Sequence, residues 1–98
     1  MSVADAAAFT GAFVLDVREP SEWVTGHIAG AKLIPLGQLP TRLAEVPRDR
    51  AVVVVCRTGN RSAQGRDILV GAGYTAVTSM TGGMTDWIAQ GNPVATGN

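Results

Sequence analysis

The sequence predicts an α/β domain with a mostly parallel sheet that is covered by helices on both faces. Short apolar runs of strand length alternate with segments of helical spacing, and turn residues separate them. The run from 51 to 55, an alanine and four valines, has no polar alternation, which is typical of a central strand in a parallel sheet. The 98 residues are 46% hydrophobic and 16% charged, so one core can form, and we expect a single domain over residues 1–98.

Four short strands are expected from the apolar runs. They cover residues 13–17, 32–34, 51–55 and 76–78. The second is the weakest because it stops at Pro35. Ligands of such sheets lie beyond the carboxyl ends of the strands, so the residues that follow the first and third strands are expected to meet at one edge.

Helices are expected between and after these strands. Residues at helical spacing predict a first helix that Pro47 closes, through Leu36, Leu39, Leu43 and Val46. A second begins near Arg61 or Ser62 and ends at the glycines of residues 71 and 73. Gly65 in its interior costs about 1 kcal/mol relative to alanine, so we expect this glycine to pack closely against the sheet. A last short helix contains Met84, Trp87 and Ile88.

Charge and composition exclude several classes of function. Eight basic and eight acidic residues cancel, so no global field attracts nucleic acid or a membrane surface. Cys56 and His27 are the only residues of their types, which excludes an internal disulfide and a zinc site. The sequence contains no membrane-spanning run and does not begin like a signal peptide. We therefore expect a cytoplasmic protein without a metal or other cofactor.

The only cysteine lies where the valine strand ends, in the segment VVVVCRTGNRS of residues 52–62. If a helix starts near residue 61, residues 57–61 form a tight turn whose amides point inward and can hold an anion. Gly59 gives this turn its backbone freedom, and Asn60 tolerates left-handed geometry. Arg57 and Arg61 add two positive charges.

These features favour a thiolate over a thiol at Cys56. A free cysteine has a pKa of about 8.5, and helix N-termini and neighbouring cations lower it to roughly 3.5–7.5. We expect the pKa of Cys56 to lie clearly below the ordinary value, which makes the sulfur a nucleophile at neutral pH. The alternative is a buried, inert cysteine, but such a residue does not need a doubly basic turn after it.

Four segments together resemble the rhodanese homology domain. They are LDVREPSEW at 15–23, GHIAGA at 26–31, VVVVCRTGNRS at 52–62 and GGMTDW at 82–87. All four occur in the expected order, and the resemblance extends from about Val14 to Pro93. It implies a three-layer α/β fold with a mostly parallel, five-stranded sheet, and sulfurtransferase activity through a persulfide on Cys56.

The resemblance also implies roles for the residues around the cysteine. The substrate-binding loop would consist of Arg57, Thr58, Gly59, Asn60, Arg61 and Ser62. Asp16 and Arg18 would brace this loop from the end of the first strand. A small anionic sulfur donor is expected, with thiosulfate as the first choice. The acceptor, a thiol or protein or cyanide in an assay, must come from outside because the chain has no second cysteine.

Other functions remain open at this stage. Cysteine phosphatases and arsenate reductases use a similar loop, but the phosphatases generally place one residue more between cysteine and arginine than the four that separate Cys56 from Arg61. A persulfide carrier without turnover, or a regulatory binding module, is the other alternative. His27 is expected to fix a turn, because a thiolate needs no general base.

Overall fold

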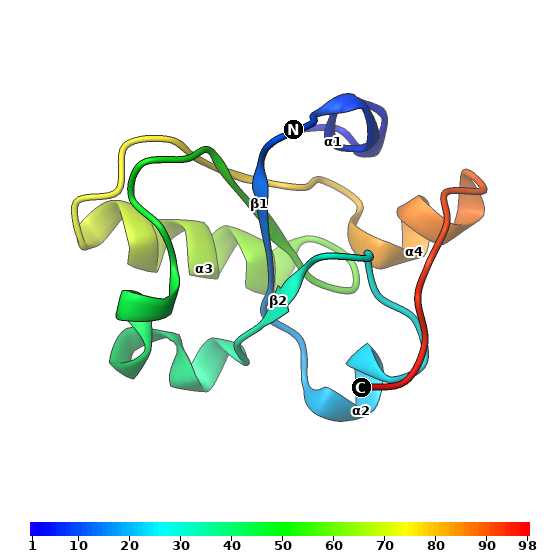
Figure 1. The fold of residues 1–98 in the computed structure, drawn as a ribbon, viewed down its shortest axis with the longest axis horizontal. Helices are drawn as coiled ribbons and strands as arrows, with labels where there is room; N and C mark the ends of the chain where they lie inside the picture. Colours follow the sequence, from blue (N-terminus) through cyan, green and yellow to red (C-terminus); the bar gives the residue numbers. More distant parts are fainter.

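The computed structural model describes residues 1–98 and contains a four-stranded, wholly parallel sheet. The strands are β1 (Phe13–Asp16), β2 (Lys32–Leu33), β3 (Val52–Val55) and β4 (Val77–Ser79), in the spatial order β2-β1-β3-β4. Figure 1 shows this sheet crossing the middle of the molecule. The central strands β1 and β3 pair over their whole length, from Phe13 opposite Val52 to Asp16 opposite Val55.

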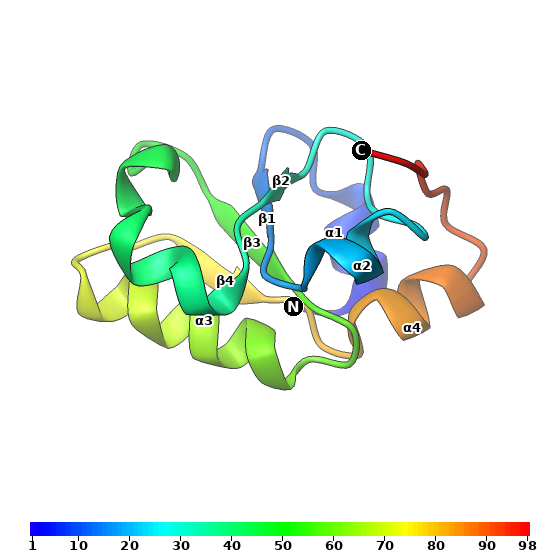
Figure 2. The ribbon, with the colours of Figure 1, turned by 90° about the horizontal axis from the view of Figure 1, so that it is seen from below.

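Helical segments cover the sheet on both sides. The α-helices are α1 (Val3–Ala8), α2 (Pro20–Trp23), α3 (Asn60–Gly71) and α4 (Gly83–Ala89), and two 3-10 helices are η1 (Leu36–Thr41) and η2 (Leu43–Glu45). Figure 2 shows the strands between α3 with the 3-10 helices on one side and α1 with α4 on the other.

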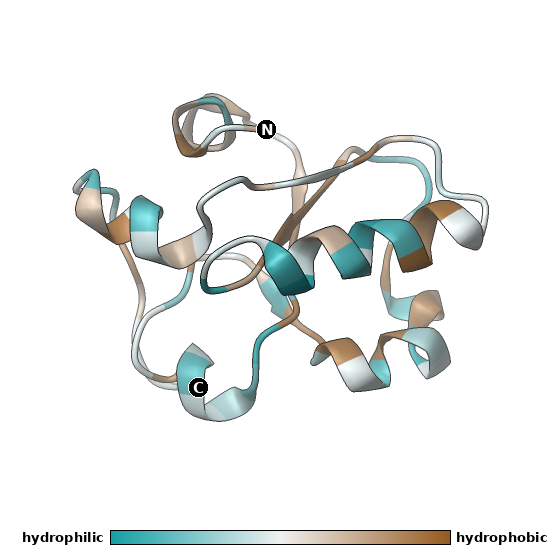
Figure 3. Cartoon of the chain, turned by 180° about the vertical axis from the view of Figure 1, so that it is seen from behind, coloured by the Kyte–Doolittle hydropathy of each residue, from teal (hydrophilic) through white to brown (hydrophobic).

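Each face of the sheet has its own apolar core because strand side chains alternate between the faces. On the α3 side, Val52 and Val54 pack in a cluster that also contains Leu15, Leu39 and Leu69. On the opposite side, the alternate valines of β3 pack with side chains from α1 and α4, among them Val3, Met84 and Trp87. The two clusters explain why the strands are hydrophobic, and Figure 3 shows that the first turn of α3 is hydrophilic by contrast.

The fold class is confirmed, and three details differ from the expectation. The sheet has four strands instead of five. After α4 the chain forms only an isolated antiparallel bridge between His27 and Ala95, near Pro93, which has no amide to donate to a ladder. Residues 36–46 form 3-10 helices because Pro40 lies inside the segment and interrupts α-helical hydrogen bonding. The helices α1 and α2 lie outside the elements that the sequence predicts.

Gly65 allows α3 to lie close against the sheet, as expected. A Cβ atom there would lie 3.1 Å from Cγ1 of Val54 and 3.4 Å from Cγ1 of Val17. The helix begins at Asn60, one residue earlier than expected, and ends at Gly71. This position brings the first turn of α3 next to the carboxyl end of β3. None of the helices combines the length and the apolar character that crossing a membrane requires.

Candidate functional site

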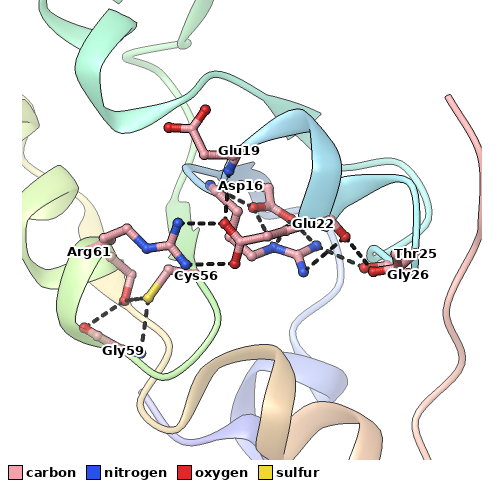
Figure 4. A network of polar contacts seen from close by, with 10 residues as sticks. Asp16, Glu19, Glu22, Thr25, Gly26, Cys56, Gly59 and Arg61 are labelled. Carbon is pink, nitrogen blue, oxygen red and sulfur yellow. Dashed lines mark hydrogen bonds and ion pairs between the residues drawn. The ribbon is translucent and has the colours of Figure 1, made fainter.

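Cys56 lies at the carboxyl end of β3, where the parallel topology also places the end of β1. The residue is only 1% exposed and belongs to the apolar cluster on the α3 side of the sheet. Its sulfur is nevertheless in contact with polar groups from the loop that follows. Figure 4 shows the sulfur facing Gly59, with Arg61 and Glu22 beside it.

The amide of Gly59 donates a hydrogen bond to Sγ of Cys56 over 2.9 Å. Gly59 has a φ of +116°, a left-handed conformation that a residue with a side chain rarely adopts, and it is the N-cap of α3. No side chain caps this helix end. The sulfur therefore occupies the place at which a helix N-terminus accepts an anion or a capping side chain.

The pKa of Cys56 is lowered from its ordinary value, in the direction that the sequence predicts. Burial raises this pKa and is the largest single influence, but it is outweighed by hydrogen bonding. The hydroxyl and the amide of Ser62, then the amides of Gly59 and Thr58, stabilise the charged sulfur and lower the pKa. Local hydrogen bonding is thus the main stabilisation of the charged sulfur, whereas the sequence also predicts a contribution from the arginines.

Ser62 contacts the sulfur from the first turn of α3 and is fully buried. The Cys56 thiol donates to Oγ of Ser62 over 3.5 Å, and the Ser62 hydroxyl donates to the carbonyl of Gly59 over 2.9 Å. A second hydroxyl, that of Ser79 on β4, lies 2.6 Å from Oγ of Ser62. Ser79 was not among the residues that the sequence singled out.

Arg61 forms a two-pronged ion pair with Glu22 of α2. Its Nη1 and Nη2 atoms lie 2.6 and 2.8 Å from the two carboxylate oxygens. The hydrogen bond from Arg61 lowers the pKa of Glu22 to about 2, so this carboxylate is ionised at neutral pH. Arg61 therefore already has an anionic partner within the chain. Arg57 is exposed and forms no ion pair.

Asp16 and Arg18 form a buried ion pair that supports the loop only indirectly. Arg18 donates to Asp16 through Nε and Nη2 over 2.8–3.1 Å, and both residues are at most 4% exposed. Arg18 also donates to the carbonyls of Gly26 and Glu22, over 2.8 and 3.4 Å. The pair therefore holds the segment that carries Glu22, and Glu22 in turn holds Arg61.

The start of α4 braces the cysteine loop from the other side. The amides of Met84 and Thr85 donate to the carbonyls of Cys56 and Arg57 over 2.8 and 3.0 Å. Gly83 has a φ of +62°, and a Cβ atom at this position would collide with both carbonyls. The glycine pair at residues 82–83 is the only sign of this contact in the sequence.

His27 has a structural position, as expected. Its ring stacks on that of Trp23 with centroids 3.6 Å apart, and its Nδ1 donates to the Trp23 carbonyl over 2.8 Å. The side chains present no cluster of potential metal ligands. A cavity of about 220 Å³ lies apart from Cys56, between α1 and the sheet, and is lined only by apolar residues such as Phe9, Val14 and Met80.

A parallel α/β sheet with a cysteine held by loop amides at the end of a central strand defines a protein that can present a reactive thiolate. The family model described as rhodanese-like domain matches residues 2–90, and the chain belongs to this family. The resemblance seen in the sequence is thereby confirmed.

Known relatives carry sulfurtransferase names. A protein named sulfurtransferase from Allochromatium vinosum is 38% identical over 81 residues, which cover 83% of this chain and 76% of that protein. The thiosulfate sulfurtransferase GlpE of Stutzerimonas stutzeri is 32% identical over 77 residues, covering 79% of this chain and 71% of that one. The crystal structure of a rhodanese-related protein from Thermoplasma volcanium superposes with a TM-score of 0.92 at 35% identity, covering 99% of this chain and 97% of that chain.

Proposed function

We propose that this protein is a sulfurtransferase that carries sulfane sulfur as a persulfide on Cys56. The observation that supports this most strongly is the hydrogen bond from the Gly59 amide to Sγ, at the N-terminus of α3. A sulfur in this position is stabilised as an anion, and the thiolate is the nucleophilic form of cysteine. The sulfurtransferase names of the relatives support the same reaction class.

The proposed reaction has two displacement steps, with thiosulfate as the donor. The Cys56 thiolate attacks the outer sulfur of thiosulfate, a new S–S bond forms, and the old S–S bond breaks with its electron pair leaving on sulfite. An external thiolate or cyanide then attacks the outer sulfur of the persulfide. The bond to Cys56 breaks, and its electron pair returns to the cysteine as thiolate. No oxidant or reductant is consumed.

The loop would stabilise the negative charge at both steps. The amides of Thr58, Gly59 and Ser62 already act on Sγ, and a persulfide anion would lie in the same electrostatic environment. Of the two arginines in the cysteine loop, Arg57 is the one without an ion-pair partner, so we assign to it the attraction of an anionic donor. Thr58 and Asn60 are exposed, and we expect them to line the entrance.

The cover over the sulfur affects how the donor enters. Cys56 is 1% exposed, so we expect that side chains of the loop must move before its sulfur can attack a donor. Arg57 and Thr58 are exposed and are therefore free to move. The requirement favours small donors over bulky electrophiles. The acceptor must be external, since the chain has one cysteine.

The test is a panel of donors and acceptors applied to the wild type and to Cys56→Ser. We expect the wild type to gain one sulfur atom by mass spectrometry after thiosulfate, and to lose it to cyanide or a thiol. The serine variant should gain none. Sulfur transfer that persists in Cys56→Ser, or a wild type that accepts sulfur from no donor, would contradict the proposal.

The same panel separates an enzyme from a carrier, and added assays with a phosphate ester and with arsenate test the other two alternatives. A carrier or regulatory module would accept at most one sulfur per molecule and release it only to a specific protein, whereas an enzyme turns over with small acceptors. A phosphatase or arsenate reductase would hydrolyse phosphate esters or reduce arsenate. The four residues between Cys56 and Arg61, and the pairing of Arg61 with Glu22, argue against those last two activities.

A further inference from the structure

Ser79 lies outside the cysteine loop, yet it is hydrogen-bonded to the residue that contacts the sulfur. It is the last residue of β4, an edge strand that pairs with β3, and it is opposite Val54 in the register. Side chains of a strand alternate between faces, so Val77 and Ser79 point to the same side of the sheet. Val77 packs against the apolar cluster on the α3 side. At the next position on that side, Ser79 meets Ser62 over 2.6 Å.

The three protons of this cluster have a limited set of arrangements. The Gly59 carbonyl can only accept, so the Ser62 hydroxyl is the donor in their 2.9 Å contact. The two lone pairs of Oγ of Ser62 are then available to two donors, the Cys56 thiol at 3.5 Å and the Ser79 hydroxyl at 2.6 Å. The thiol form of the site therefore satisfies all three groups, with Ser79 donating to Ser62.

Ionisation of Cys56 removes one of these donors and leaves an acceptor in its place. The Ser62 hydroxyl can then rotate its proton from the Gly59 carbonyl to Sγ. The carbonyl is not left without a partner, because the amide of Ala63 also donates to it over 3.2 Å. Ser79 has no other hydrogen-bond partner for its hydroxyl and continues to donate to Ser62 in both forms.

We propose that Ser79 is a positioning residue for sulfur transfer: its hydroxyl holds the Ser62 hydroxyl in place and polarises it as a donor to the sulfur of Cys56. A hydroxyl that accepts one hydrogen bond donates the next one more strongly, and Ser62 itself is fully buried, while Ser79 is partly buried. The inference rests on the proposed role of Cys56 as the nucleophile.

The charged groups around the cluster make their contacts without the Ser79 hydroxyl, so we expect them to stay in place when Ser79 is changed. On α3, Arg61 is paired with Glu22 of α2, and at the end of β1 Asp16 is paired with Arg18. Behind β4, the amino group of Met1 donates to the carbonyl of Ser79 and to Oγ1 of Thr78. These contacts use the backbone or the opposite face of β4, so they remain after removal of the Ser79 hydroxyl.

The test is a double-mutant cycle that measures the pKa of Cys56 from the pH dependence of its alkylation. We expect Ser62→Ala to raise this pKa by about one unit, since a hydrogen bond to the charged sulfur is lost. Ser79→Ala should raise it by about half a unit. Once Ser62 is alanine, the further change Ser79→Ala should have no effect, because Ser79 acts only through Ser62.

Three further variants make the result specific. Ser79→Thr keeps the hydroxyl and should restore the wild-type pKa. Ser79→Val lacks the hydroxyl but suits a strand, and it should behave as Ser79→Ala even if the alanine variant folds poorly. Thr78→Val removes the neighbouring hydroxyl on the other face of β4 and should leave the pKa unchanged.

An unchanged pKa in both Ser79→Ala and Ser79→Val would overturn the inference, and so would equal shifts by Ser79→Ala in the presence and absence of the Ser62 hydroxyl. Where sulfur transfer is measured, its pH profile should move to higher pH in Ser79→Ala by the same amount as the pKa. Alkylation needs no sulfur donor, so a failure of the proposed function, with no persulfide formed, is distinguishable from a failure of this inference.

Discussion

Two strand-to-helix connections in this protein begin alike, and their helix N-termini have different partners. β3 leads to α3 and β4 leads to α4, and in both cases a glycine in the left-handed conformation is the N-cap, Gly59 and Gly82. At α3 the amide of Gly59 donates to the sulfur of Cys56. At α4 the amides of Met84 and Thr85 donate to main-chain carbonyls of residues 56 and 57.

The comparison shows how one helix prepares the site at another. In a planar trans peptide, the carbonyl and the amide point in opposite directions. Because α4 holds the carbonyls of Cys56 and Arg57, the amides of the same peptide units, those of Arg57 and Thr58, point away from α4. The Thr58 amide is one of the groups that lower the pKa of Cys56. The anion-stabilising geometry therefore depends on a helix that is hydrogen-bonded to the backbone of the loop and not to the sulfur.

The largest effect is expected from Gly83→Ala, which would break the contact between α4 and the loop. The left-handed conformation is unfavourable for alanine, and the added methyl collides with the carbonyls of Cys56 and Arg57. We expect the free energy of unfolding to fall by about 2 kcal/mol or more, and the pKa of Cys56 to rise towards its ordinary value. Denaturant unfolding and thiol titration measure the two effects.

Gly71→Ala is the matched control for this change. A Cβ atom at Gly71 meets nothing within 4 Å, and the residue has no positive φ. Alanine there should leave the pKa of Cys56 unchanged and raise the free energy of unfolding by about 0.5 kcal/mol. If Gly83→Ala changes the free energy of unfolding and the pKa of Cys56 as little as this control does, then α4 does not brace the cysteine loop.

A smaller effect is expected from Glu22→Gln, which tests whether the charge beside the loop matters as well as the amides. The pair with Arg61 is half-buried, so we expect a loss of about 1 kcal/mol in the free energy of unfolding at neutral pH. Arg61 would then lack its anionic partner, which should lower the pKa of Cys56 further. A higher pKa of Cys56 in Glu22→Gln would contradict the view that Glu22 neutralises the charge of Arg61 beside the sulfur.

The pH dependence of stability gives a second measure of the same pair. The pKa of Glu22 is about 2 in the folded protein, below its ordinary value of 4.5. The unfolded chain therefore binds a proton at Glu22 before the folded one does, so the stabilisation is complete above about pH 4.5 and is lost as the pH falls towards 2. The wild type and Glu22→Gln should converge over this range. Asp67→Asn, in an exposed pair with Arg66, is the control for the removal of a surface charge.

Local sequence patterns were enough to predict the centre of the fold. The unbroken valine run of β3, a glycine inside an otherwise helical segment and the residues of the cysteine loop are each recognisable from a few neighbouring positions in the sequence. The limits of the strands and of α3 followed from them to within one or two residues. Residues 36–46 are helical as predicted, but they form two short 3-10 helices instead of one continuous helix, because Pro40 interrupts the segment.

The parts of the site that escaped prediction depend on contacts between distant segments. Arg61 and Glu22 are 39 residues apart, and Ser62 and Ser79 are 17 apart. The sequence shows that Arg61 is near Cys56, but it does not show that Arg61 is already paired with the carboxylate of Glu22. In the same way, a serine at the end of an edge strand has no local signal that identifies its hydroxyl as part of a cluster at the sulfur.

The pKa of Cys56 in the folded wild-type protein is the most direct test of the whole account. Its alkylation rate should be measured against pH, with the unfolded chain as the reference for an unperturbed thiol. The account predicts a midpoint clearly below about 8.5, with the unfolded chain titrating near that value. A midpoint in the folded protein at or above that of the unfolded chain would mean that burial outweighs the amides and hydroxyls around the sulfur, and the account would be wrong.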